Sequence, residues 1–226
     1  MTQIAQITSG VFKSGEVSYE FAHASVRKSN ASKNDDTVVV LPKADELAVL
    51  VADGATGFGM GNVASGALGK YFASNFETPN TARKSKRFLI DADNAVRLAC
   101  VDGAEESDTT GIVLSVSSSG IEGASAGDSQ AIIFGVTTCE LTAKQRRRPR
   151  IGNGAYPEEF TARLAPGDVL VLATDGLWNM VKQESVGKTA LSAEGVDQAV
   201  AKLIASARNS AGNYSDDVSV VCVKIA

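Results

Sequence analysis

The links between short apolar runs most constrain the fold of this 226-residue chain. The runs are rich in β-branched and apolar residues and are bounded by glycine, proline, serine or aspartate, as β-strands are. Those that we predict as strands are residues 16–26, 37–41, 47–52, 110–116, 121–126, 131–136, 160–164, 169–173 and 218–225. Residues 117–120 (SSSG) and 165–168 (APGD) each join two of these runs. Because parallel strands need a crossover of about a dozen residues or more, such short links predict antiparallel pairing.

Helical periodicity interrupts the strands at residues 62–76, 83–100 and 193–207. Apolar residues recur there at spacings of three and four, which gives each predicted helix one apolar face. Strands precede the first two helices, and a longer series of strands separates these from the last helix. This grouping indicates an α+β fold, in which helices pack outside an antiparallel β-sandwich.

Composition narrows the class of protein. A chain with 44% hydrophobic residues suits a single domain over residues 1–226, with two small domains as the alternative. A net charge of -4 provides no general attraction to nucleic acid or to an anionic membrane. No apolar run could span a bilayer, and the first residues lack the pattern of a secretory signal. Cys100, Cys139 and Cys222 are widely spaced and odd in number, which favours buried, reduced side chains and a cytoplasmic location.

Acidic residues stand where the predicted strands begin or end. Asp53 and Asp175 each close an apolar run and are each followed by glycine. The others are Asp35, Asp36, Asp128, Asp216 and Asp217, which open strands or lie in a turn between them. A single Asp-Gly pair is usually a turn. Two such pairs after apolar strands, combined with the other aspartates, favour a functional site.

The chemistry of such a site follows from charge. Carboxylates gathered at one point repel one another, and a multivalent cation holds them together. Without a histidine or cysteine cluster they prefer hard ions, so we expect Mn²⁺ or Mg²⁺. Two ions roughly 3.5–4 Å apart can activate a water for attack on a phosphoester. Gly54, next to Asp53, allows a close backbone approach, and its carbonyl is a candidate ligand.

Six blocks of sequence carry a resemblance to a known family. They are NDDT (34–37), DGATGFGMGNVAS (53–65), DTTGIVLSV (108–116), GDSQA (127–131), LAPGDVLVLATDGLWNMV (164–181) and SDDVSVVCV (215–223). In this order the chain resembles the type-2C metal-dependent protein serine/threonine phosphatases, the PPM class, including their bacterial and SpoIIE-like branches. The resemblance covers about residues 27–223.

The resemblance implies a four-layer α-β-β-α sandwich with a metal site at one end. It implies that Asp53 bridges two Mn²⁺ or Mg²⁺ ions, with the Gly54 carbonyl on one of them. The remaining ligands that it implies are Asp175 and Asp216 on one ion, Asp35 and Asp36 directly or through waters, and Asp128 for a weaker third ion. The implied reaction is direct hydrolysis of phosphoserine or phosphothreonine without a phosphoenzyme. The implied substrate is a phosphoprotein, a kinase or its target, and we expect a monomer.

The sequence departs from the family pattern at the general acid. Members often carry a histidine in the Asp-Gly loop, where this chain has Ala55 and Phe58. The sole histidine, His23, falls in a predicted strand. A missing general acid costs a factor of about 10²–10⁴. The alternative is therefore a catalytically weak or inactive phosphatase-like module that binds a phosphoprotein.

The phosphate-binding position also departs from the pattern. The family's arginine stands four residues before the acidic pair, whereas Arg27 lies eight residues before Asp35. We choose Arg27 as the phosphate-binding residue, with Lys33 as the second choice. Gln130 stands where an arginine usually follows the Gly-Asp-Ser block.

Two other segments admit competing interpretations. The basic run RRRPR (146–150) lies in a flap that could attract an acidic phosphopeptide or could be a solvated loop. GMGNVA (59–64) fits a dinucleotide-binding pattern, but residues 53–58 separate it from the strand and a second helix follows, which disfavours that function.

Overall fold

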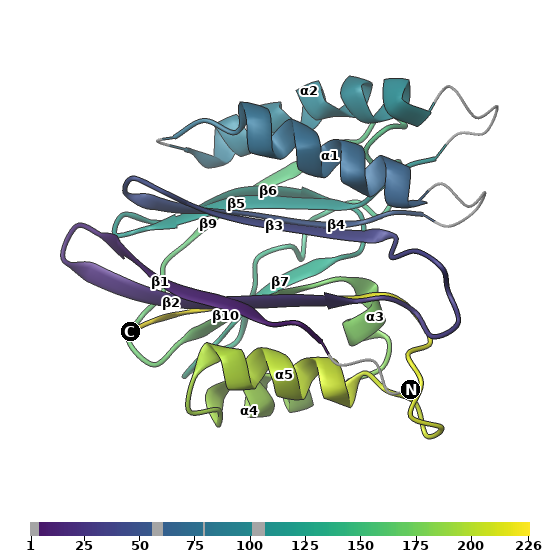
Figure 1. Ribbon diagram of the computed structural model, residues 1–226. Helices are drawn as coiled ribbons and strands as arrows, with labels where there is room; N and C mark the ends of the chain where they lie inside the picture. The colour runs from purple at the N-terminus through teal and green to yellow at the C-terminus, as the bar shows by residue number, and fades with distance from the viewer. Residues whose placement is uncertain (1–4, 56–60, 79, 101–106) are drawn as a thin grey trace.

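The computed structural model describes residues 5–55, 61–78, 80–100 and 107–226. Two antiparallel sheets face each other, and a pair of helices covers the outer face of each (Figure 1). The predicted α+β sandwich with flanking helix pairs is confirmed. No helix in the described part of the chain has both the length and the hydrophobicity needed to cross a bilayer.

The strands are distributed between a six-stranded and a five-stranded sheet. The six-stranded sheet has the order β1 (Thr8–Ser14), β2 (Val17–Val26), β11 (Val218–Ile225), β10 (Val169–Ala173), β7 (Gln130–Phe134), β8 (Cys139–Glu140). The five-stranded sheet has the order β3 (Asp36–Lys43), β4 (Glu46–Asp53), β5 (Gly111–Ser117), β6 (Gly120–Ala126), β9 (Glu158–Ala162). Strands β1 and β8 were not predicted from the sequence.

The helices pack on the two outer faces. The five-stranded sheet carries α1 (Gly61–Asn75) and α2 (Ala82–Cys100), and the six-stranded sheet carries α4 (Gln183–Leu191) and α5 (Val196–Ser206) (Figure 1). The short helix α3 (Asp175–Trp178) follows β10 directly. Three helices match the predicted segments. Helix α3 was missed because it is a single turn, and α4 was missed because its buried residues are only Val186, Gly187 and Ala190, which make a weak apolar pattern.

Buried side chains form three apolar layers. Leu170 and Leu172 of β10 join the central layer between the sheets, whereas Val171 and Ala173 join the layer under α4 and α5. A third layer lies between α1, α2 and the five-stranded sheet. Because successive residues of a strand point to opposite faces, a strand covered on both sides must be apolar throughout. This explains why the runs before Asp53 and Asp175 contain no polar alternation.

One predicted strand pairing is wrong. Strands β5 and β6 pair across residues 117–120 as expected, but β9 pairs with β6, and β10 pairs with β7 and β11. Residues 163–168 therefore cross from one sheet to the other, through a turn in which Asp168 N–H donates to the Ala165 carbonyl at 3.0 Å. Six residues easily span the ~10 Å between stacked sheets. The rule that short links force pairing does not distinguish a hairpin from a link between sheets.

Of the cysteines, all unpaired, Cys100 and Cys222 are buried as predicted, but Cys139 is exposed on β8.

Candidate metal site

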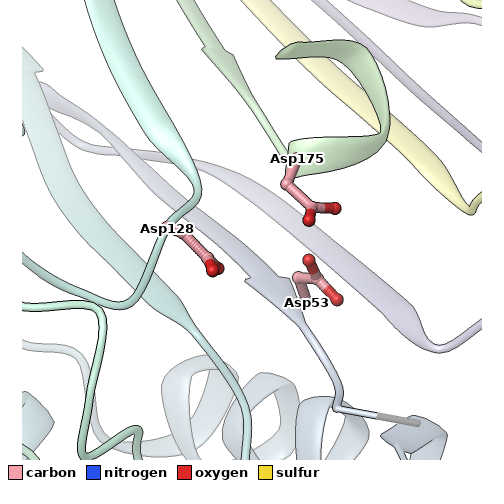
Figure 2. A group of neighbouring side chains, drawn as sticks. All are labelled: Asp53, Asp128 and Asp175. Atoms are coloured by element: carbon pink, nitrogen blue, oxygen red, sulfur yellow. The ribbon is translucent and has the colours of Figure 1, made fainter. Parts of the chain in front are cut away.

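Three aspartates from separate parts of the chain converge at one end of the sandwich. Asp53 ends β4, Asp175 begins α3 after β10, and Asp128 lies in the turn between β6 and β7. One carboxylate oxygen from each lies within 4.8 Å of the others (Figure 2). Asp53 belongs to the five-stranded sheet and Asp175 follows a strand of the six-stranded sheet, so both sheets contribute to the group.

Asp36 extends this group below the surface. It is the β3 partner of Asp53 in the strand register, and its carboxylate is buried. The Thr174 hydroxyl donates a hydrogen bond to Asp36 Oδ2 at 2.8 Å. Because Thr174 immediately precedes Asp175, this bond ties the ends of the two sheets together.

The carboxyl groups of this cluster have raised pKa values. Burial, together with the negative charges of Asp36 and Asp175, raises the pKa of Asp53 to about 9. Burial likewise raises the pKa of Asp36 to about 8, against hydrogen bonds from Ser219 and Thr174 that lower it. The pKa of Asp175 is raised by burial and by the charge of Asp216. Such a group needs protons or cations to offset its mutual repulsion.

The donor set suits a hard dication. Among the described residues of the group the ligands are all carboxylates, which Mn²⁺ and Mg²⁺ accept and which zinc sites rarely use alone. The trio therefore fits the ions predicted from the sequence.

Asp217 has a positioning function that the sequence did not reveal. Its carboxylate accepts hydrogen bonds from the backbone N–H of Lys28, at 2.5 Å, and of Asp35, at 2.7 Å. The Asp35 carboxylate in turn accepts the N–H of Asn62, at 2.8 Å, in the first turn of α1. Asp35 is thus fixed beside the Asp-Gly loop, and the neighbouring Asp216 carboxylate accepts the Asp217 N–H at 3.0 Å.

Both glycines of the Asp-Gly pairs permit close backbone contacts. A Cβ on Gly54 would lie 2.0 Å from the Gly61 carbonyl oxygen, and one on Gly176 would lie 1.9 Å from the Asp217 carbonyl oxygen. Each aspartate is therefore followed by a residue that packs directly against another backbone segment, where only glycine fits.

The two phosphate-binding candidates lie apart from these contacts. Arg27 is exposed and donates to the Ser32 carbonyl at 3.1 Å, within the segment that separates Arg27 from Asp35. Lys33 is exposed. Within the described part of the chain, neither side chain forms an ion pair or hydrogen bond with a carboxylate of the group. Their phosphate-binding function remains a prediction.

Arg150 is a member of the site that sequence reasoning missed. Its Nη2 lies 3.1 Å from Asp128 Oδ2, and its Nη1 lies 3.7 Å from Asp108 Oδ1. The other arginines of the run, at 146–148, are exposed, so the interpretation as a solvated loop suits them but not Arg150. No signal in the sequence marks Arg150, because its position beside Asp108 depends on the long-range pairing of Ile151 with Thr109.

Other predicted features fall as follows. His23 lies inside β2, paired with Thr8 and Val221, and burial lowers its pKa. Trp178 packs beneath the Asp175 turn and donates Nε1–H to the Ala173 carbonyl at 3.0 Å. Phe58 and residues 59–60 of the dinucleotide-like pattern lie outside the described residues. Residues 61–64 open α1, and α2 follows α1 as the argument against that function required.

The fold matches that of known phosphatases. The Mycobacterium tuberculosis serine/threonine phosphatase PstP/Ppp aligns with a TM-score of 0.74 and 20% identity, over 91% of this chain and 98% of that chain. The catalytic domain of PstP in complex with two manganese ions aligns with a TM-score of 0.76 and 21% identity, over 96% of this chain and 99% of that chain. RsbX in complex with magnesium aligns with a TM-score of 0.74 and 15% identity, over 97% of this chain and 100% of that chain. At these identities the likeness establishes the fold.

The chain thus has the fold of these serine/threonine phosphatases. The family model described as Stage II sporulation protein E (SpoIIE) matches residues 60–226. The chain belongs to the SpoIIE family, and the resemblance predicted from the sequence is confirmed. Among curated proteins, none matches the sequence significantly.

Proposed function

We propose that the protein is a metal-dependent phosphatase that hydrolyses phosphoserine or phosphothreonine on a protein. The observation that carries this proposal is the convergence of Asp53, Asp128 and Asp175 from three separate connections of the sandwich. The family membership and the metal-bound phosphatases of the same fold support it.

The proposed ligands follow from position. Asp53 is central, because the charges of Asp36, Asp175, Asp128 and Asp216 all raise its pKa. We assign it as the carboxylate shared by two Mn²⁺ or Mg²⁺ ions. Asp175 and Asp216 would hold one ion, and the Gly54 carbonyl, with Asp35 and Asp36 directly or through waters, would hold the other.

Bound dications would lower the pKa of a coordinated water, which makes hydroxide available near neutral pH. The residues of the chain hold and orient this arrangement. Thr174 fixes the Asp36 carboxylate and Asp217 fixes the backbone of Asp35 through hydrogen bonds, and the rigid strand ends set the separation of the ligands. We expect a phosphoprotein substrate, a monomeric enzyme and a cytoplasmic location.

The test is turnover of a phosphoserine peptide by the purified protein, with Mn²⁺ and then with EDTA. We expect turnover with Mn²⁺ and none in chelator. Asp53→Ala and Asp175→Asn should each abolish it, whereas Asp91→Asn, on the outer face of α2, should leave it unchanged. Undiminished turnover in EDTA, or wild-type rates in either site variant, would contradict the proposal.

A second candidate is a phosphoprotein-binding module without turnover. The observation in its favour is the position of His23 inside β2, which leaves no histidine to protonate a leaving group. Binding of Mn²⁺ and of the phosphopeptide without hydrolysis would favour this candidate over the enzyme.

A further inference from the structure

The candidate site contains a cation of its own. The guanidinium of Arg150 approaches both oxygens of Asp128, with Nη2 at 3.4 Å from Oδ1 and 3.1 Å from Oδ2. The same side chain faces Asp108 through Nη1, at 3.7 Å. All three side chains are mostly buried, with exposed fractions of 15%, 19% and 13% for Arg150, Asp128 and Asp108. Ion pairs shielded from water in this way are screened by salt less than exposed pairs are.

The backbone fixes Arg150 in this position. Ile151 exchanges two hydrogen bonds with Thr109, both of 2.9 Å, in an antiparallel bridge that holds the segment carrying Arg150 against residues 108–110. The carboxylate of Asp93 on α2 accepts the N–H groups of Gly152, at 2.9 Å, and of Ala155, at 3.1 Å. The segment that follows Arg150 is thus anchored to α2 and to the strand that leads into β5.

The placement has a consequence for ion binding. A third dication on Asp128 would have to take the carboxylate oxygens that the guanidinium approaches. It would also lie close to a fixed positive charge, and like charges at short range repel strongly where water is excluded. Arginine keeps its charge at any pH at which the protein folds.

We propose that Arg150 takes the place of a third dication at Asp128 and Asp108, so that the chain binds two ions rather than three. This inference rests on the proposed function for the other two ions, which Asp53 and Asp175 hold. The single positive charge of Arg150 permanently offsets one of the two negative charges of Asp128 and Asp108, whereas a weakly bound ion would act only at high metal concentration. It acts as a positioning residue that keeps Asp128 directed at the site.

The test is the number of Mn²⁺ ions bound, measured by the electron paramagnetic resonance of free Mn²⁺ during a titration to millimolar concentration. We expect two ions for the wild type and three for Arg150→Gln, which removes the charge and keeps hydrogen-bonding capacity. Asp128→Asn in the Arg150→Gln background should lose the added ion. Arg150→Lys, which keeps the charge, and Arg147→Gln, an exposed neighbour, should both bind two.

The outcomes separate the two proposals. Three ions in the wild type, or two in a folded Arg150→Gln variant, would overturn the function of Arg150 and leave the phosphatase proposal standing. No bound ion in the wild type would overturn both. The wild-type count alone remains decisive if Arg150→Gln fails to fold, which circular dichroism detects.

Discussion

Replacing Asp53 by asparagine should stabilise the metal-free protein. The pKa of Asp53 rises from 3.8 to about 9 on folding, so at pH 7 this carboxyl must take up a proton when the chain folds. At about 1.36 kcal/mol for each pH unit between 3.8 and 7, that uptake costs about 4 kcal/mol. Asp36 and Asp175 share the same repulsion, so we expect Asp53→Asn to recover about 2–4 kcal/mol. Asparagine has nearly the same shape as aspartate, so the two side chains differ mainly in charge.

The sign of the pH dependence makes this prediction specific. A raised pKa means that the folded state holds more protons than the unfolded chain, so stability falls as pH rises from about 4 to about 9. Near pH 4 the wild-type carboxyl is protonated in the folded state and about half protonated in the unfolded chain, so the gain from asparagine should nearly vanish there.

Thermal unfolding in EDTA at pH 4 and pH 7 measures the effect. At roughly 2–4 °C per kcal/mol for a domain of this size, Asp53→Asn should raise Tm by roughly 5–15 °C at pH 7. With Mn²⁺ the order should reverse, because the ions stabilise only the wild type. Asp91→Asn, which removes an exposed ion pair with Arg87, should change stability by less than about 1 kcal/mol. A Tm in EDTA at or below that of the wild type at pH 7, or an equal gain at both pH values, would refute the electrostatic reasoning.

Three further substitutions, one of them with a matched control, test the scaffold of the site. Gly176→Ala should destabilise the fold by about 1–3 kcal/mol and abolish ion binding, because its Cβ would meet the Asp217 carbonyl oxygen, whereas Gly66→Ala on α1, with nothing within 4 Å, should stabilise by about 0.5–1 kcal/mol. Chemical denaturation with Mn²⁺ titration compares the two, and equal effects would contradict the close-contact argument. Asp93→Ala should speed hydrogen exchange at residues 152–155 without affecting the central strands; unchanged protection there would show that other contacts hold this segment. Leu172→Ala should cost about 2–5 kcal/mol in denaturant unfolding, and a loss below about 1 kcal/mol would contradict its place in the central layer.

The sequence carried most of the fold because both faces of the sandwich strands are covered. Continuous apolar runs identified strands such as β4, β5 and β10, and glycine and aspartate marked their ends. Strand β1 escaped because its side chains alternate between exposed and buried without a strongly apolar pattern. The link between β9 and β10 was misassigned because local turn chemistry does not encode which sheet receives the next strand.

The candidate site was predictable as a set of residues but not as a geometry. The positions of Asp53 and Asp175 after apolar strands indicated a common function, and the structure brings them together with Asp128. The contacts of Asp217 and Arg150 depend on long-range contacts that no local sequence pattern encodes. These join Asp217 to Lys28 and residue 109 to residue 151.

The division of the acidic group between the two sheets couples metal affinity to the central apolar layer. The side chains of that layer act as spacers, because their volume sets how far the end of β4 stands from the end of β10. Substitutions that thicken or thin this layer should therefore tune ion affinity from a distance, with no ligand altered. Conversely, a bound ion should link the two sheets at this end and suppress their separation.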